Sequence, residues 1–226
     1  MGSTSSGWSG GFRDGLGLGV GAFALAVSFG AFAASEGWPV PLVIIMSTVV
    51  FSGSAQFALV TALSGGAGLA SGLAAASLIN ARFIPMAAAV SRSLSGGRLR
   101  RGLEGQAVID SSWVLAQQPQ GGFDRAKMIG ATLVQWPAWI AGSALGALLV
   151  PPPATVRATG LDLVFPCFFL LLLLDSVRAD RRHRNVALVA AAIAAAAVTG
   201  LPAGPALLLS GLAAALVLVR AKRAEQ

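Results

Sequence analysis

Polar side chains interrupt an apolar run that is long enough to cross a membrane. The run extends from about residue 42 to residue 63, and its centre reads Ser52-Gly53-Ser54-Ala55-Gln56. Thr48, Ser52 and Gln56 recur at every fourth position, so they would share one face of a helix. In hydrocarbon, backbone groups freed at a bend need protein or water partners. The pattern predicts either a lined cavity that binds a solute or hydrogen bonds across a packed helix interface.

A second polar group falls inside the next apolar run, about residues 67–90. Asn80 ends a stripe of small residues at intervals of four, which carries it into a helix–helix contact. Arg82 follows, and Pro85 should kink the helix because proline lacks the backbone donor. Arg82 lies eight residues before Val90, roughly 12 Å of helix. It could snorkel to the interface, but we favour a fixed positive charge that faces a polar cavity.

The only acid near these runs with a candidate role is Asp110. It lies in an amphipathic stretch, about residues 105–118, after a basic loop that contains Arg92, Arg98, Arg100 and Arg101. This stretch either lies at the membrane interface, which we favour slightly, or crosses as a short helix with Asp110 inside the bundle. The basic loop is predicted to be cytoplasmic.

The composition is that of a polytopic membrane protein. Of 226 residues, 55% are hydrophobic and 11% are charged, and the mean hydropathy is +0.75. The formal charge is +7, but the basic residues cluster beside apolar runs, so we do not expect nucleic-acid binding.

We therefore predict an all-α integral membrane protein with six or seven transmembrane helices, some of them broken or short, and a weak internal repeat. The expected organisation is a disordered tail (1–13), one transport domain (14–220, with a cytoplasmic segment at about 91–127) and a cytoplasmic C-terminal tail (221–226). The apolar runs lie at about 14–34, 42–63, 67–90, 128–150, 161–177, 186–199 and 206–219. Charge placement does not fix the side of the N-terminus, which differs between six and seven crossings.

Small residues recur every four positions in the first run. Gly11, Gly15 and Gly19 begin the stripe, and Gly30 ends it. Such stripes let helix backbones approach closely, so this helix should pack centrally in the bundle. Gly142 and Gly146 repeat the spacing in the run at 128–150.

Catalysis is not expected from this chain. The single histidine, His183, lies in a basic loop far from any buried serine, whereas a serine nucleophile needs a base beside it. The sequence offers no metal-ligand cluster, no phosphate-binding loop and no sign of a cofactor. The polar residues within the helices rank a secondary transporter first, a channel second and a non-catalytic assembly subunit third.

The motifs in these runs resemble those of the AzlC family, the large subunits of bacterial branched-chain amino-acid exporters. The resemblance rests on Ser28-Phe29-Gly30, on Met46-Ser47 followed by Phe51-Ser52-Gly53-Ser54-Ala55-Gln56-Phe57, and on Leu78-Ile79-Asn80-Ala81-Arg82. The chain departs from the family at Asp110-Ser111, where an acidic pair is usual, and at Arg82-Phe83, where Arg-His is common.

The resemblance implies proton-driven export of branched-chain or similar amino acids across the bacterial plasma membrane, with a small hydrophobic AzlD-type subunit as partner. Self-association is also compatible with the sequence. In this interpretation Arg82 attracts the substrate carboxylate, Asn80 braces the site, and Asp110 is the candidate proton carrier. The predicted substrate contacts are Phe51, Ser52, Gly53, Ser54, Gln56, Phe57, Asn80 and Arg82.

Overall fold

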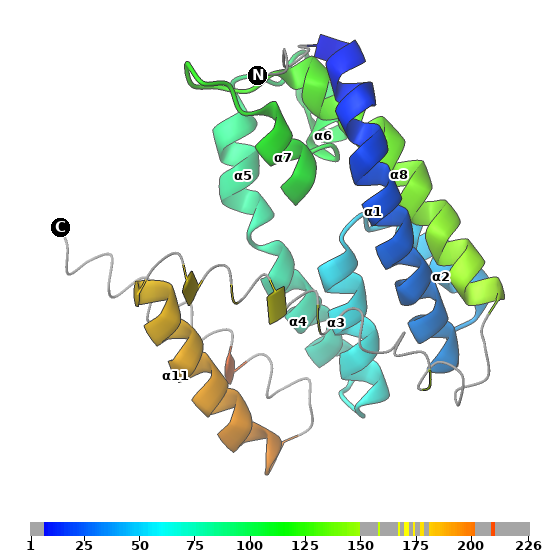
Figure 1. The fold of residues 1–226 in the computed structure, drawn as a ribbon. Helices are drawn as coiled ribbons and strands as arrows, with labels where there is room; N and C mark the ends of the chain where they lie inside the picture. Colours follow the sequence, from blue (N-terminus) through cyan, green and yellow to red (C-terminus); the bar gives the residue numbers. More distant parts are fainter. Residues whose placement is uncertain are drawn as a thin grey trace. The chain divides into compact units, whose positions relative to one another are not determined.

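The computed structural model describes residues 7–149 and 181–201, together with residues 158, 167, 170, 171, 174, 177, 178, 209 and 210. Over this part of the chain the secondary structure is helical, without a strand (Figure 1). The chain forms two compact units. The first comprises residues 1–53 and 80–161, and the second comprises residues 54–79 and 162–226.

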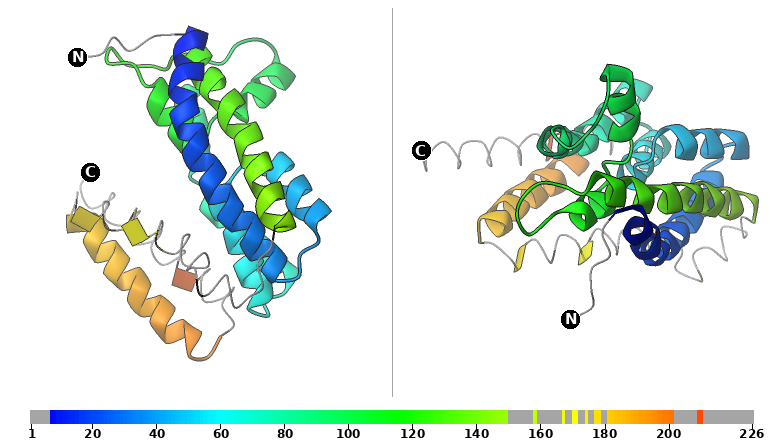
Figure 2. Two further views of the ribbon diagram at one scale, coloured as in Figure 1. Left: turned by 45° about the vertical axis from the view of Figure 1, so that its right-hand side comes forward. Right: turned by 90° about the horizontal axis from the view of Figure 1, so that it is seen from above.

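Two long helices, α1 (Gly7–Ser35) and α8 (Arg125–Leu148), form the body of the first unit. They lie side by side in every view (Figures 1 and 2). A Cβ on Gly15 would lie 2.9 Å from the Ala131 Cα, and one on Gly142 would lie 2.5 Å from the Phe23 carbonyl oxygen. These distances are shorter than van der Waals contact, so the backbones meet where glycine removes the side chain. The predicted close packing of the first helix is confirmed.

The predicted disordered tail at residues 1–13 is wrong for residues 7–13, because α1 already begins at Gly7. The Gly7 backbone donates to the Asp124 carboxylate at 2.8 Å, and Lys127 pairs with Asp14 at 2.9 Å. Asp124 also caps α8 by accepting from the Lys127 backbone at 2.9 Å. These contacts secure the start of α1 to the start of α8, and the glycine-rich sequence alone does not show them.

Each of the two apolar runs that contain polar residues forms a broken helix. The first gives α2 (Val40–Val49) and α3 (Gly53–Ser64), separated by three non-helical residues. The second gives α4 (Leu69–Asn80) and α5 (Phe83–Val90), separated by Ala81 and Arg82. In a continuous helix Pro85 would have to donate to the Ala81 carbonyl, which it cannot do. Ile84 donates to that carbonyl instead, at 3.1 Å, so the predicted kink is a break one turn before the proline.

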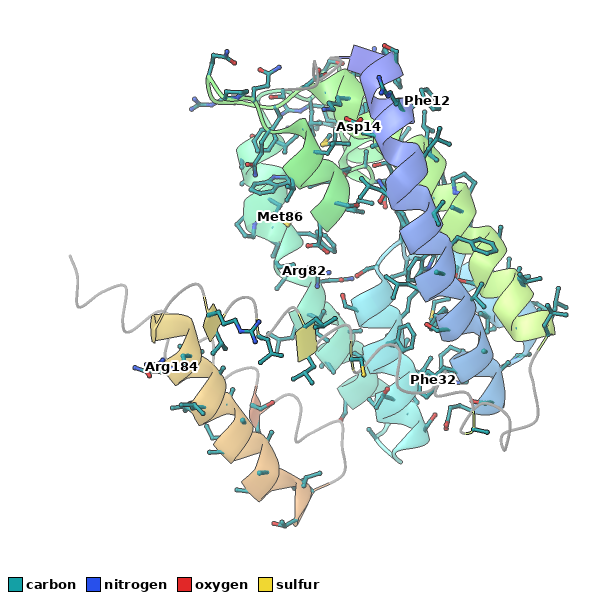
Figure 3. The ribbon with its side chains drawn as sticks, viewed as in Figure 1. Phe12, Asp14, Phe32, Arg82, Met86 and Arg184 are labelled. Carbon is teal, nitrogen blue, oxygen red and sulfur yellow. The ribbon has the colours of Figure 1, made fainter. Side chains whose placement is uncertain are left out.

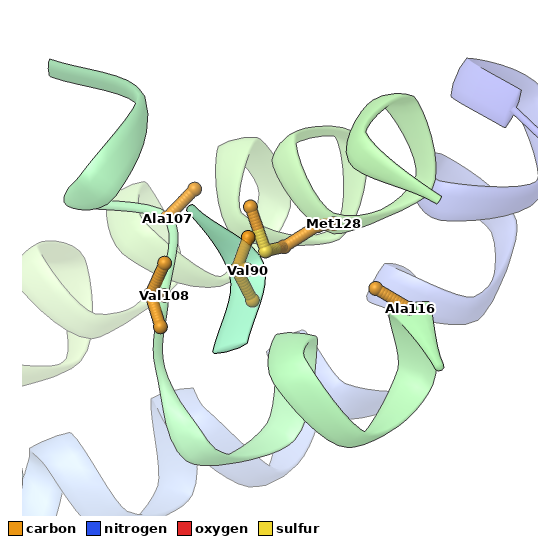
Figure 4. Close-up of a cluster of buried hydrophobic side chains, with 5 residues drawn as sticks. All are labelled: Val90, Ala107, Val108, Ala116 and Met128. Carbon is orange, nitrogen blue, oxygen red and sulfur yellow. The ribbon is translucent and has the colours of Figure 1, made fainter. Parts of the chain in front are cut away.

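The predicted loop at about 91–127 contains α6 (Arg98–Gly105) and α7 (Asp110–Ala116). Buried apolar side chains hold this segment on α5 and α8: Val90, Ala107, Val108, Ala116 and Met128 (Figure 4). At about 1.5 Å per residue, the seven residues of α7 span roughly 10 Å. The helix is therefore too short to cross a bilayer, which needs about 20 residues.

The second unit contains α3, α4 and α11 (Arg181–Val198). Gly72 on α4 admits the side chains of Leu59 and Leu63 on α3, since a Cβ there would lie 3.1 Å and 3.3 Å from their methyl carbons.

Among the described residues, two segments are long and apolar enough to span a membrane, Gly7–Ser35 and Leu69–Val90, and Val40–Val49 and Arg184–Val198 are shorter apolar helices. The runs predicted at 161–177 and 206–219 lie largely outside the described residues, so the number of crossings stays a prediction.

Candidate functional site

The two helix breaks meet at one hydrogen bond. The Ser52 hydroxyl donates to the Asn80 side-chain oxygen at 2.6 Å. Ser52 is in the break between α2 and α3, and Asn80 is the last residue of α4. Both belong to the first unit. The structure therefore brings together two polar residues that the sequence predicted separately, at the points where both helices lose their regular hydrogen bonding.

The first break is fixed by tryptophans of α8. The Trp136 indole donates to the Thr48 carbonyl at 3.2 Å, close to the end of α2. The Trp139 ring lies where a Cβ on Gly53 would be, with a ring carbon at 2.9 Å from that position, and it makes an edge contact with Phe51 at 6.3 Å between centroids. Gly53 is thus required by the close approach of an indole.

A buried hydroxyl pair fixes the preceding turn. Ser47 on α2 donates to Ser143 on α8 at 2.8 Å, and neither side chain is exposed. Together with Trp136 and Trp139, this contact holds α2 and the first break against the middle of α8.

The second break contains Arg82, which forms a two-point ion pair with Asp110. Nε donates to Oδ1 at 3.0 Å and Nη2 donates to Oδ2 at 2.8 Å. The guanidinium also lies over the Phe83 ring, 4.6 Å from its centroid. Figure 3 labels Arg82 at the junction of α4 and α5. The sequence predicted either snorkelling or a fixed charge facing a cavity; the structure shows Arg82 paired with Asp110 of the same chain.

The pair is partly exposed: the Arg82 and Asp110 side chains are 35% and 61% exposed. Asp110 begins α7, and the next residue secures this helix to α8, because Ser111 donates to Gln135 at 2.6 Å. On the other side the Trp113 indole donates to the Met86 carbonyl on α5 at 3.3 Å.

Three predicted site residues belong to the second unit: Ser54, Gln56 and Phe57. All three are buried in the first turn and a half of α3. Of the other predicted residues, the first unit brings Phe51, Ser52 and Gly53 together with Asn80, Arg82 and Asp110 around the two breaks.

A mainly apolar groove of about 290 Å³ adjoins the first break. Its lining comes from the end of α2 and the break, from α6 and the segment after it, and from α8: Thr48, Val49, Phe51, Leu103, Glu104, Gln106, Ala107, Ile129, Thr132, Leu133 and Trp136. Phe51 therefore contacts Trp139 on one side and contributes to an apolar groove on the other.

Sequence reasoning missed a buried carboxylate at one end of this groove. Glu104 accepts from Arg125 at 2.7 Å, from Arg100 at 3.0 Å and from the Ser95 backbone at 3.1 Å. The hydrogen bonds from Arg125 hold the pKa of Glu104 well below its usual range, although burial opposes them. The i,i+4 spacing of Arg100 and Glu104 was visible in the sequence, but the partner on α8 was not.

Comparisons with known proteins point to a family and to relatives described as membrane proteins. The family described as AzlC protein matches residues 17–151. An uncharacterized membrane protein of Helicobacter pylori strain J99 is 25% identical over 185 residues, covering 80% of this chain and 81% of its own length. A similarly described protein of strain 26695 is 24% identical over 169 residues, covering 74% of each chain. No solved structure matches the chain.

Proposed function

Because the chain belongs to the AzlC family, we propose that it is a secondary transporter that exports branched-chain or similar small hydrophobic amino acids from bacteria. The proposal places it in the plasma membrane with a cytoplasmic C-terminus, a small AzlD-type subunit as partner and the proton gradient as the driving force. The family match and the relatives described as membrane proteins support a role in membrane transport; the substrate and the energy source are our inference.

The observation that carries the proposal is the junction of two broken helices through polar side chains. Transporter sites form where membrane helices are interrupted, since the interruption exposes polar groups that can hold a solute. Here Ser52 bonds Asn80 across the breaks at 2.6 Å, and Arg82, two residues after Asn80, adds a partly exposed positive charge. A purely structural subunit would not need a charged residue at this position.

The substrate would meet complementary groups at this junction. Its carboxylate would bind Arg82, and the Ser52 hydroxyl and the Asn80 amide would supply hydrogen bonds. Phe51, which lines the apolar groove, would contact the aliphatic side chain. Asp110 remains our candidate for the proton carrier.

The test is efflux from cells preloaded with radiolabelled leucine or valine, with the chain expressed alone and together with its presumed partner subunit. We expect efflux that depends on the chain and is strongly reduced in Arg82→Gln. Losing a charged hydrogen bond worth about 1.5–3 kcal/mol corresponds to a drop of at least about tenfold.

The amount of tagged protein in the membrane must be the same for the wild type and for Arg82→Gln. Normal leucine efflux by Arg82→Gln would refute the assignment of the site. No efflux by the wild type of any solute in an amino-acid panel would favour a channel or an assembly subunit.

A further inference from the structure

The positive and negative side chains of the Arg82–Asp110 pair are complementary to the carboxylate and the ammonium group of an amino acid. We propose that a zwitterionic substrate binds across this pair, with its carboxylate on Arg82 and its ammonium on Asp110, so that a proton on Asp110 competes with the substrate. This inference rests on the proposed function and deepens it, because it assigns a partner to the substrate's ammonium group and makes the binding of substrate and proton mutually exclusive.

The geometry supports this arrangement. The guanidinium and the carboxylate face one another through two parallel hydrogen bonds of 3.0 Å and 2.8 Å, which is the planar pairing that Arg also makes with free carboxylates. Both side chains are partly exposed. A bound zwitterion would replace the ion pair between Arg82 and Asp110 by two ion pairs, one with each side chain. Arg82 exchanges the Asp110 carboxylate for the substrate carboxylate, and Asp110 exchanges the guanidinium for the ammonium.

Charge balance selects the substrate class. The pair is neutral, and a zwitterion leaves it neutral, whereas a monocarboxylate or an amine would leave one of the two charged side chains without a charged partner. The loss of a charged hydrogen-bonding partner weakens binding. The site should therefore prefer α-amino acids over acids or amines that have the same carbon skeleton.

The same arrangement fixes the direction of coupling. Protonation makes Asp110 neutral, so it no longer attracts the ammonium, and substrate and proton occupy the site alternately. Alternate occupancy is what exchange of an internal substrate for an external proton requires. If the proton instead promoted substrate binding, both would move in the same direction and the inward proton gradient would drive uptake.

The surroundings of Asp110 make it a suitable group for this exchange. In the described part of the chain, Arg82 is the charged side chain that faces it. The elements packed against α7 are α5, which has no charged residue, the segment that follows α7, whose Asp124 carboxylate accepts from Gly7 and Lys127, and α8, whose Arg125 and Lys127 pair with Glu104 and Asp14 in its first turn. The contact from α8 beside Asp110 is the neutral Gln135.

The experiment measures binding by the purified full-length protein in detergent. The probes are L-leucine, 4-methylpentanoate, which lacks the ammonium, and 3-methylbutylamine, which lacks the carboxylate. We expect the wild type to prefer leucine over both by at least about tenfold, as for a lost charged partner. Asp110→Asn should lose the preference for leucine over 4-methylpentanoate, and Arg82→Gln should lose the preference over 3-methylbutylamine.

Asp14→Asn is the matched control, because it removes the acid of another ion pair in the same unit and should leave all three preferences unchanged. Leucine binding by the wild type should weaken as the pH is lowered, and this dependence should be reduced in Asp110→Asn. If Asp110→Asn does not fold, Asp110→Glu and the wild-type pH series decide: retained preference with weaker binding at low pH supports the exchange, and stronger binding at low pH refutes it.

The outcomes separate the two proposals. Equal weakening of all three probes in both variants, or an unchanged leucine preference in Asp110→Asn, refutes the zwitterion site even if the wild type exports leucine. If each variant loses its expected preference but the wild type exports no amino acid, the result supports the zwitterion site and refutes the proposed export function.

Discussion

At the residue scale, the hydrogen bond from the Ser52 hydroxyl to the Asn80 side-chain oxygen joins the two helix breaks. Ser52→Ala removes the donor and leaves the Asn80 oxygen without this partner. We expect unfolding to become easier by about 1 kcal/mol and leucine efflux to fall by about tenfold, because the breaks lose their fixed separation.

Ser35→Ala is the matched control for this prediction, since Ser35 bonds only the carbonyl of its own helix turn at 2.7 Å. Efflux and thermal unfolding of both variants should be measured side by side. Equal effects of the two substitutions would contradict a special role of Ser52.

Glu104 gives a pH-dependent prediction at the same scale. Its pKa in the folded protein is well below the usual range because Arg125 donates to it, so its contribution to stability is present above the usual glutamate pKa. The contribution is lost as the pH falls through the usual value towards the lowered one. The wild type should therefore lose thermal stability below about pH 5.

Glu104→Gln should be less stable at neutral pH by about 3 kcal/mol, because Arg125 loses its charged partner, and its stability should depend less on pH. Thermal unfolding in detergent from about pH 4 to pH 8 measures both effects. Parallel curves for the two proteins would show that another group controls the acid sensitivity.

At the scale of elements, the contact of α1 with α8 depends on glycine. A side chain on Gly142 would meet the Phe23 carbonyl at 2.5 Å, so Gly142→Leu should separate the helices and prevent stable folding. Gly21→Leu is the control, because nothing lies within 4 Å of a Cβ there. Yield and monodispersity in detergent distinguish the two variants. A well-folded Gly142→Leu protein would contradict the observed packing.

Local sequence predicted the elements better than their pairing. Pro85 acts on its own backbone, and the polar residues around Gly53 interrupt their apolar run, so both helix breaks could be expected from the chain alone, as could the small-residue face of α1. Asp110 lies 28 residues from Arg82 and Glu104 lies 21 residues from Arg125. Each pair forms only after several helices have packed, and neither residue carries a local signal for its partner.

At the scale of the whole molecule, a zwitterion carries no net charge, so the membrane potential alone does no work on it. Export against a concentration gradient therefore needs a second, coupled species whose own gradient supplies the energy, and the proton is our candidate. We expect a proton ionophore to abolish concentrative leucine efflux and to leave downhill exchange across the membrane. Concentrative efflux that persists without a proton gradient would exclude proton coupling.

The tryptophans at the first break have a practical consequence. The Trp136 indole bonds the Thr48 carbonyl, and the Trp139 ring contacts Phe51 and adjoins Gly53. Any rearrangement of residues 50–52 must change the surroundings of both indoles. The chain has three other tryptophans, so replacing those three by phenylalanine would leave a protein whose intrinsic fluorescence reports on the break between α2 and α3, in real time and without an attached dye.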